Sequence, residues 1–426
     1  MRENRRSWLA VAAVMFGVGW GANQFTSLLI AYHLHLGLTL SFNEALFGIY
    51  ALGLIPALLV GGPASDRWGR RTVVRPAAVM SVVATVILMV GAHSTPLLFI
   101  GRFLAGMVSG AVFAAGTAWV KELSVPPFDP AAGEQSGARR AAIGLSAGFG
   151  LGPLAAGLIA QWAPAPLVAA YLPHLAVMAL VLPGLWRVPE TVPQLAGGGP
   201  SLAARMRVPS AAHPRFLSMV VPVAPWVFGS ASVSFAVLPS VVSGRTQGFG
   251  IAFAGLVAAL TLGVGVAVQP VARRFDRVGS PRGALAGLIL VTVGMAVAAL
   301  AATLNNPLVV VAAGAVLGAG YGVCLVGGLL EVQRIAAPGE LAGLNAVFYA
   351  LTYVGFAFPV VVAELARFTS FTVLLLGLTG VAGACLAVVA AGATRAQHSR
   401  ASGPRRRRGR PTGFRGRGRS PTADHR

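Results

Sequence analysis

Long apolar segments dominate this chain and limit what it can fold into. Of its 426 residues, 56% are hydrophobic and only 11% are charged, and the mean hydropathy is +0.74. Soluble domains contain about 25% charged residues, so the chain lacks the charged surface that a soluble enzyme of its length needs. The apolar runs reach about 20 residues, the length at which a helix crosses a bilayer. We therefore expect an all-α polytopic membrane protein that lies in the lipid bilayer.

Twelve such runs follow one another along the chain, and each predicts one transmembrane helix. The runs are continuous rather than alternating, which argues against a transmembrane barrel. The spans are expected near residues 8–32, 42–62, 73–93, 96–120, 138–162, 167–187, 216–241, 249–270, 283–303, 307–330, 341–363 and 371–393.

Arginine positions predict how these spans are oriented. Positive residues collect in alternate loops, and the loops on the other side contain only Arg245 and Arg367. Short cytoplasmic loops are rich in Lys and Arg, so both termini are expected in the cytoplasm. No cleavage site of small residues follows a short first run, so the first span is expected to be retained. The predicted location is multi-pass in the cell (plasma) membrane.

Two similar segments indicate an internal duplication. Asp66-Arg67-Trp68-Gly69 follows the second span, and Asp276-Arg277-Val278-Gly279 follows the eighth. Parallel six-span halves place a substrate site between them, near the bilayer midplane. We expect two pseudo-symmetric six-helix halves over 1–187 and 216–393, a cytoplasmic linker over 188–215 and a disordered basic tail over 394–426. The absence of a Gly-x-x-x-x-Gly-Lys-Ser/Thr loop argues against ATP-driven pumping.

The segment after the second span contains the most specific motif, Gly62-Pro-Ala-Ser-Asp66-Arg67-Trp-Gly69-Arg70-Arg71. Gly62 would let this helix end approach a neighbour closely, and Gly69 would permit a tight turn. With the span count and the duplication, the motif resembles the signature Gly-x-x-x-Asp-Arg/Lys-x-Gly-Arg/Lys-Arg/Lys of the major facilitator superfamily. The resemblance implies alternating access by two rocking halves, with Asp66 contacting a neighbouring helix to hold one access state.

The second copy of this motif is degraded. Ala272 stands at the position of Gly62, and Ser280-Pro281 replace the arginine pair, so a weaker gate is expected in the C-terminal half. The alternative is that the arginines of the first copy only set the topology. The candidate gate residues are Gly62, Asp66, Arg67, Gly69, Arg70, Arg71, Asp276, Arg277 and Gly279.

Two further spans contain patterns that resemble those of the family. Arg102, Gly106 and Gly110 lie on one face of the fourth span, and Arg102 is a candidate for proton coupling or substrate contact, or else an interfacial anchor. The fifth span resembles the family's exporter-associated pattern, in which a proline bends the helix and glycines allow close packing. That resemblance favours efflux, and the alternative is a packing kink without directional meaning. The residues of the fifth-span pattern are Gly148, Gly152, Pro153 and Gly157.

Polar and aromatic residues in the middle of spans are candidates for the substrate pathway. Such residues are costly in a bilayer and often face a cavity, although interhelical hydrogen bonds explain them equally well. Because the candidate wall is aromatic with few charges, a lipophilic small-molecule substrate is expected. The candidates are Trp20, Asn23, Gln24, Trp226, Tyr321, Asn345 and Tyr349.

Proton coupling needs a side chain that binds and releases a proton during the cycle. The first span contains Asn23 and Gln24 and no carboxylate, so the remaining acidic candidates are Glu44, Glu331 and Glu340. All three lie near span ends, where we expect an interfacial environment. His174 is expected to be a packing residue.

The remaining sequence features predict no catalytic chemistry. Cys324 and Cys385 lie in apolar runs and offer neither a disulfide framework nor metal-ligand spacing, and no cofactor is expected. The loops contain no paired acids and no nucleophile elbow, so the chain is not expected to be an enzyme. The Arg-rich tail favours contact with anionic lipids, and no nucleic-acid partner is expected.

We therefore predict a secondary transporter that uses protons to export a small, largely apolar compound. Uptake or facilitated diffusion of a small metabolite is the alternative. A polytopic sensor or scaffold that acts through the tail is a more distant one.

Overall fold

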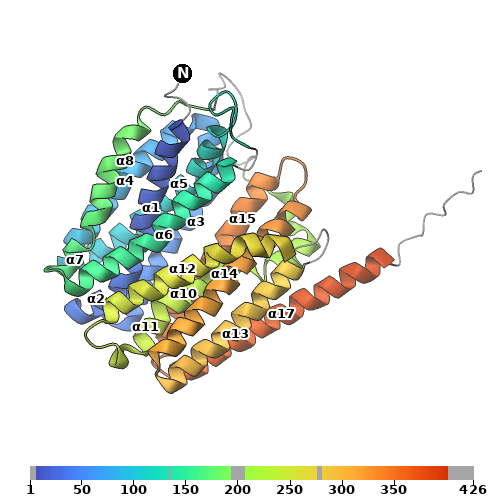
Figure 1. The fold of residues 1–426 in the computed structure, drawn as a ribbon. Helices are drawn as coiled ribbons and strands as arrows, with labels where there is room; N and C mark the ends of the chain where they lie inside the picture. Colours follow the sequence, from blue (N-terminus) through green and yellow to red (C-terminus); the bar gives the residue numbers. More distant parts are fainter. Residues whose placement is uncertain (1–5, 134–135, 193–206, 276–280, 402–426) are drawn as a thin grey trace, which may run out of the picture.

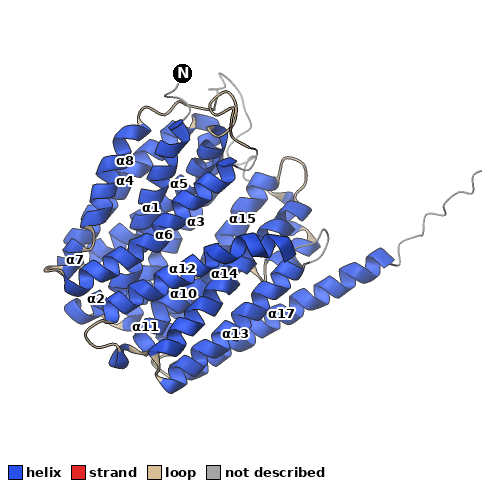
Figure 2. Cartoon of the chain, in the orientation of Figure 1, coloured by secondary structure: helices blue, strands red, loops and turns tan. Residues whose placement is uncertain are grey.

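The computed structural model describes residues 6–133, 136–192, 207–275 and 281–401, and within these ranges it contains helices and loops without strands (Figure 2). Figure 1 shows two groups of helices, α1–α8 and α10–α17, which form an N-terminal and a C-terminal half. Among the described residues, eleven helices or helix pairs are long and apolar enough to cross a membrane. The first span completes a set of twelve, as expected, and consists of two shorter helices that meet at Gln24.

The N-terminal half contains the first six spans, and its helices agree with the expected ranges to within several residues. The first span is formed by α1 (Ser7–Asn23) and α2 (Phe25–Leu36), and the sixth by α7 (Pro166–Ala169) and α8 (Leu172–Leu185). The four spans between them are α3 (Leu40–Trp68), α4 (Arg70–Val90, followed by a 3-10 turn over Gly91–His93), α5 (Thr95–Glu122) and α6 (Ser136–Trp162).

The C-terminal half begins with an irregular seventh span. A 3-10 turn over Pro209–Ala212 precedes it, and α10 (Ala224–Ser232) and α11 (Leu238–Val241) alternate with π-helical turns at Phe216–Val220 and Val233–Val237. Such π turns are frequent at functional sites. A 3-10 turn at Ser243–Arg245 leads to the remaining spans, which are α12 (Gly250–Phe275), α13 (Arg282–Leu304), α14 (Pro307–Ile335), α15 (Leu341–Val354) with α16 (Ala357–Leu365), and α17 (Phe371–Ala401).

The boundary of the basic tail differs from the expected one. Helix α17 continues to Ala401, beyond the expected end at 393, because residues after the apolar run extend the same helix. The rest of the tail lies outside the described residues. So do Asp276, Arg277 and Gly279 of the second motif copy.

The bundle of helices has a linker end and a hairpin end. The linker end is where α1 begins and where α8 leads into residues 186–192, and the hairpin end is the opposite one, where α2 ends and α3 begins. Glycines allow the helices of each half to pack with their backbones in contact, and the two halves meet most closely at the hairpin end (Figure 1).

Candidate functional site

Helices α6 and α12 bring the two halves together at the hairpin end. A Cβ atom at Gly255 of α12 would lie 2.7 Å from the carbonyl oxygen of Pro153, and one at Gly157 of α6 would lie 3.1 Å from the Gly255 Cα. Nearby, Gln161 donates to the Gly248 carbonyl at 2.9 Å and accepts from the Ile251 amide at 3.0 Å. The fifth-span pattern therefore lies at a backbone-to-backbone contact between the halves.

The same helix packs against the first span through two other glycines. A Cβ at Gly148 would strike the carbonyl oxygen of Phe16, and one at Gly152 would lie 2.7 Å from that of Trp20. At both positions any residue larger than glycine would clash with the backbone of α1, so the two glycines allow α1 and α6 to approach closely.

Glycines on the fourth span have the same effect inside the N-terminal half. Cβ atoms at Gly106 and Gly110 would strike the carbonyl oxygens of Tyr50 and Leu54 on α3. The expectation for Gly62 was wrong, because a Cβ there would meet its nearest atom at 3.9 Å, an ordinary contact. The close approach between α3 and α5 occurs nearer the middle of both helices.

At the linker end, Arg70 is the centre of a charged network. Its guanidinium group forms ion pairs at 2.6 Å with Asp66 of α3 and with Glu122 at the end of α5. It also donates to the Ser65 hydroxyl, and Glu122 accepts from the Thr191 hydroxyl. Asp66 is therefore joined to the start of the next helix, and the network lies within the N-terminal half. Arg67 lies outside it and extends over the Trp68 ring.

Glu190, which sequence reasoning missed, caps the N-terminus of α4. Burial raises the pKa of its carboxyl group, but the backbone N–H groups of Arg71, Arg70, Val192 and Thr191 donate to it and keep the pKa below its ordinary value of 4.5. The available signal was that Glu190 is the single acid of the arginine-containing linker.

Gly69 makes this cap possible for two reasons. Its φ of +97° lies in the region that favours glycine. A Cβ atom at Gly69 would also lie 2.7 Å from the Glu190 carboxylate. The motif glycine therefore makes the turn and leaves room for the capping acid.

Arg102 is buried inside the N-terminal half rather than anchored at the interface. Only 1% of it is exposed, and it donates to the carbonyls of Leu46 at 3.2 Å and Ala22 at 3.1 Å. The rings of Phe25 and Tyr50 lie 4.4 and 4.7 Å from its guanidinium carbon. Among the described residues no carboxylate forms an ion pair with it, so carbonyl dipoles and aromatic faces stabilise the charge.

The expectation of interfacial glutamates was wrong for Glu44 and Glu331. Both are buried, because neighbouring helices cover the span ends on which they lie. Glu331 pairs with Arg215 at 2.8 Å and with Arg334 at 2.5 Å. Within the part of the chain that the structure describes, the two oxygens of Glu44 have no hydrogen-bond partner. Glu340 is partly exposed, and hydrogen bonds from the Ser210 side chain and from the Ser210 backbone amide lower the pKa of its carboxyl group.

The polar candidates of the first span are enclosed. Asn23 donates to the Phe149 carbonyl at 2.9 Å, which is an interhelical hydrogen bond. Gln24 is fully buried, and neither polar atom of its amide bonds to any of the described residues. The Trp20 indole nitrogen is also buried without a partner. His174 receives hydroxyl contacts from Ser81 and Thr85 and lies against Gly21, as expected of a packing residue.

Of the candidates in the C-terminal half, Trp226 and Tyr321 are buried, whereas Asn345 and Tyr349 are partly exposed. Trp226 is buried and packs edge-on against Phe358, within its own half. Tyr321 stacks on Phe228 with ring centroids 5.6 Å apart. Asn345 and Tyr349 are partly exposed on α15, and the Asn345 side-chain oxygen has no partner.

An aromatic cluster joins the two halves close to Glu44. Phe47 of α3 lies 4.9 Å from Phe356 and 5.9 Å from Phe235, and Tyr50 lies 6.0 Å from Phe356. Phe356 also contacts Phe228, which stacks on Tyr321 and on Tyr353 at 4.5 Å. The surface between the halves is therefore mainly aromatic at this depth. Sequence reasoning named Tyr321 and missed the phenylalanines, which do not stand out among apolar spans.

Metal and thiol chemistry has little support in the described part of the chain. Its His, Cys, Asp and Glu residues form no group of three that could hold a metal ion. Cys324 and Cys385 are unpaired thiols.

Comparison with known proteins decides the family. A model of the major facilitator superfamily matches residues 8–358. The chain belongs to the major facilitator superfamily. Among curated proteins, none matches this sequence.

Solved structures of major facilitator transporters have the same fold. A POT family transporter in complex with 5-aminolevulinic acid superposes with a TM-score of 0.77 at 13% identity, covering 92% of this chain and 97% of that one. A peptide transporter in complex with sulfate gives 0.73 at 15% identity, covering 92% and 95%. A nucleoside transporter gives 0.69 at 12%, covering 92% and 99%. Its membership of the major facilitator superfamily makes this chain a membrane transporter rather than an enzyme. At these identities the structural likeness by itself establishes the fold alone.

Proposed function

We propose that this major facilitator transporter exports a small, largely apolar compound and couples export to proton influx across the cell membrane. The observation that carries the proposal is Glu44, a fully buried carboxyl group that has no hydrogen-bond partner among the described residues. The aromatic cluster beside it offers an apolar substrate rings to pack against. The resemblance of Gly148, Gly152, Pro153 and Gly157 to an exporter pattern supports the direction, and the arginine distribution supports a cytoplasmic linker end.

Glu44 lies where the two halves meet. Ser41, Glu44 and Gly48 share one face of α3. Ser41 donates to the Ala363 carbonyl at 3.4 Å, and a Cβ at Gly48 would lie 2.8 Å from Val360. Both partners belong to α16 of the C-terminal half, so Glu44 is covered as long as α16 lies against α3.

The charged and titratable groups on the described helices around Glu44 bond to other residues and not to Glu44. Arg102 on α5 uses carbonyl acceptors, including that of Leu46, and Glu364 on α16 is exposed and pairs with Arg367 at 3.3 Å. His33 near the end of α2 bonds to the Leu38 carbonyl.

Burial without a partner suggests how Glu44 could couple protons to transport. An isolated ionised carboxylate is costly to bury, whereas the neutral acid is much less so. Closure of the hairpin end would therefore require that Glu44 first take a proton from outside water. Release of that proton to the cytoplasmic side would reset the carrier. One charge moving through 100 mV supplies about 2.3 kcal/mol, enough for a substrate gradient of roughly fortyfold.

The charged network at the linker end is proposed to act as the opposing gate. Asp66, Arg70 and Glu122 connect the ends of three helices, and the motif Arg67 and Arg71 flank them. When the halves rock, this network would hold the N-terminal half as a unit while its contacts with the other half change.

The decisive experiment measures uptake of a lipophilic fluorescent cation into inverted vesicles, with and without an imposed proton gradient. Glu44→Gln is compared with Glu364→Gln, a matched control that removes an exposed carboxylate from the same end. We expect gradient-driven accumulation in the wild type and the control. Glu44→Gln should lose accumulation but retain exchange of labelled for unlabelled dye. Gradient-driven accumulation that survives in Glu44→Gln would refute the coupling role.

Uptake or facilitated diffusion of a small metabolite remains as a second candidate because of Arg102. A buried cation without a carboxylate partner is suited to bind an anionic group of a substrate. Transport of small carboxylates in intact cells tests this alternative, and Arg102→Gln should abolish it.

A further inference from the structure

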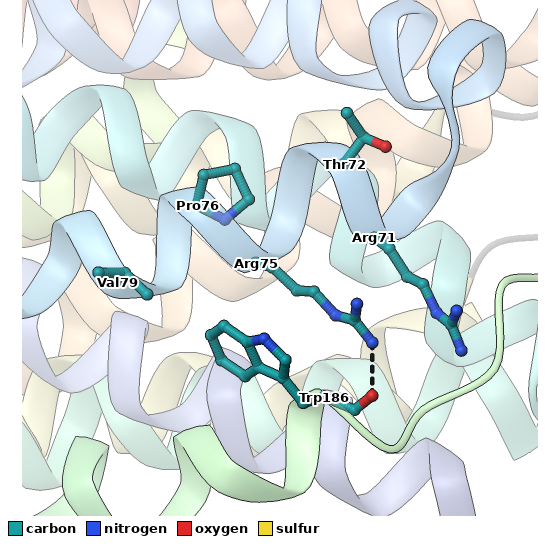
Figure 3. A pocket seen from close by; sticks show the side chains of 6 residues that line it. All are labelled: Arg71, Thr72, Arg75, Pro76, Val79 and Trp186. Atoms are coloured by element: carbon teal, nitrogen blue, oxygen red, sulfur yellow. Dashed lines mark hydrogen bonds between the residues drawn. The ribbon is translucent and has the colours of Figure 1, made fainter.

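A shallow groove at the linker end lies away from the contact between the halves. It is lined by Arg71, Thr72, Arg75, Pro76 and Val79 of α4 and by Trp186 just after α8. Figure 3 shows both arginine side chains extending from α4 toward the same side, with Trp186 beside Arg75. We propose that this groove binds the headgroup of an anionic phospholipid from the leaflet at the linker end.

The positive charge of the groove is not neutralised by ion pairs within the described residues. Arg71 donates through Nε to the Val188 carbonyl at 2.7 Å, and Arg75 donates through Nη2 to the Trp186 carbonyl at 2.6 Å. The Arg75 Nε is buried, and no described residue forms a hydrogen bond with it. Arg70, the neighbour of Arg71, is by contrast paired with two acids. Two guanidinium groups with donors left over match a phosphate, which accepts such forked hydrogen bonds.

Glu190 interacts electrostatically with Arg75, but its carboxylate is already occupied. Both of its oxygens accept backbone N–H groups at the start of α4, at 2.9 Å from Arg70 and Arg71. It therefore offsets the charge of the groove only in part and does not compete for the guanidinium forks.

An apolar track explains why the occupant is a lipid rather than a free phosphate ion. Beyond the arginines, α4 exposes a series of apolar side chains: Val79, Met80, Val83, Val86 and Val90. From Arg75 to Val83 a helix rises roughly 12 Å, which is within the thickness of about 15 Å for the hydrocarbon of one leaflet. The half-exposed Trp186 lies at the arginine end, where membrane proteins place tryptophan at headgroup level. Basic pockets between helices bind anionic headgroups in this way.

The test uses native mass spectrometry of the full chain in detergent, titrated with phosphatidylglycerol or phosphatidylcholine. Arg75→Gln removes one cation of the groove. Arg139→Gln is the matched control, because Arg139 is an exposed arginine at the same end, at the start of α6. We expect preferential binding of phosphatidylglycerol by the wild type and the control, and about fivefold weaker binding by Arg75→Gln. The basic tail is present in all three proteins and cancels from the comparison.

Two further variants and one competitor complete the test. Arg75→Lys should retain most of the binding, and Trp186→Ala, which changes a half-exposed side chain, should weaken it even if Arg75→Gln does not fold. Glycerol phosphate should not displace the lipid, because it lacks the acyl chains that follow α4. Equal losses in Arg75→Gln and Arg139→Gln, an equal affinity for phosphatidylcholine, or displacement by glycerol phosphate would each overturn the proposal. None of these outcomes depends on the direction or coupling of transport.

Discussion

The contact between α6 and α12 makes Gly255→Ala a sensitive test of alternating access. The added Cβ would lie 2.7 Å from the Pro153 carbonyl oxygen and 3.3 Å from the Gly157 Cα. Both are backbone atoms, so no flexible side chain can move aside. The two halves would have to move apart at the hairpin end to relieve this overlap, as the backbone does in overpacked protein cores.

The size of the effect follows from where the strain applies. Overpacking costs about 1–3 kcal/mol, and here it arises only while the hairpin end is closed. The helix-propensity gain of Ala over Gly, about 1 kcal/mol, applies to open and closed states alike and cancels. The equilibrium should therefore shift about 5- to 150-fold toward states with an open hairpin end. Gly263→Ala is the control, because a Cβ at Gly263 on the same helix would meet nothing within 4 Å.

Spin-label distances can measure this shift directly. Trp162→Cys and Phe249→Cys would place labels at exposed positions on opposite halves of the hairpin end, in a background where Cys324 and Cys385 are replaced by Ala. Double electron–electron resonance spectroscopy should show a larger population of long distances between the two labels in Gly255→Ala than in the parent or in Gly263→Ala. Identical distributions in all three proteins would show that the contact does not limit opening, and the reasoning would fail.

Three further predictions concern stability. Glu331→Gln removes a buried negative charge that faces two arginines, so melting in detergent should reveal a loss of roughly 3–5 kcal/mol, whereas the exposed Glu364→Gln should change little. Because the folded-state pKa of Glu190 lies below 4.5, its contribution is complete above that pH and is lost as the pH falls through the lowered value. The melting difference between the wild type and Glu190→Gln should thus shrink from pH 7 to pH 3.5, and a constant difference would contradict the capping role. Gly106→Ala should destabilise the protein by about 1–3 kcal/mol through overlap with the α3 backbone, and Gly150→Ala, where a Cβ would meet nothing within 4 Å, should not.

Span count and family could be predicted from the sequence because both depend on local patterns. An apolar run of sufficient length has few alternatives to a membrane helix, and the motif around Asp66 is specific. The environments of Glu44 and Arg102 could not be predicted in the same way. Position along a span suggested an interface for Glu44 and left an interfacial anchor as the alternative for Arg102. Burial, however, depends on which helices cover a position, and this is set by tertiary packing.

The motif residues illustrate the same limit. Gly62 and Gly69 were both expected to act through their lack of a side chain, yet only Gly69 lies against another group, the Glu190 carboxylate. Glu190 itself lies far from the motif in sequence, so no local pattern connects it with Arg70. Spacing predicted which residues could share a helix face, but not which distant residue would meet that face.

The two ends of the transporter are stabilised by different chemistry, and this difference bears on how it could switch. At the hairpin end, glycines allow α6 and α12 to touch through their backbones, and a partly exposed uncharged amide, Gln161, adds hydrogen bonds. At the linker end, Arg70 and its acidic partners form a network inside one half. Van der Waals contacts of backbone atoms respond weakly to salt, whereas partly exposed ion pairs are screened by it. Ionic strength should therefore change the rigidity of the linker end without directly opening the hairpin end, where protonation of Glu44 is the proposed control.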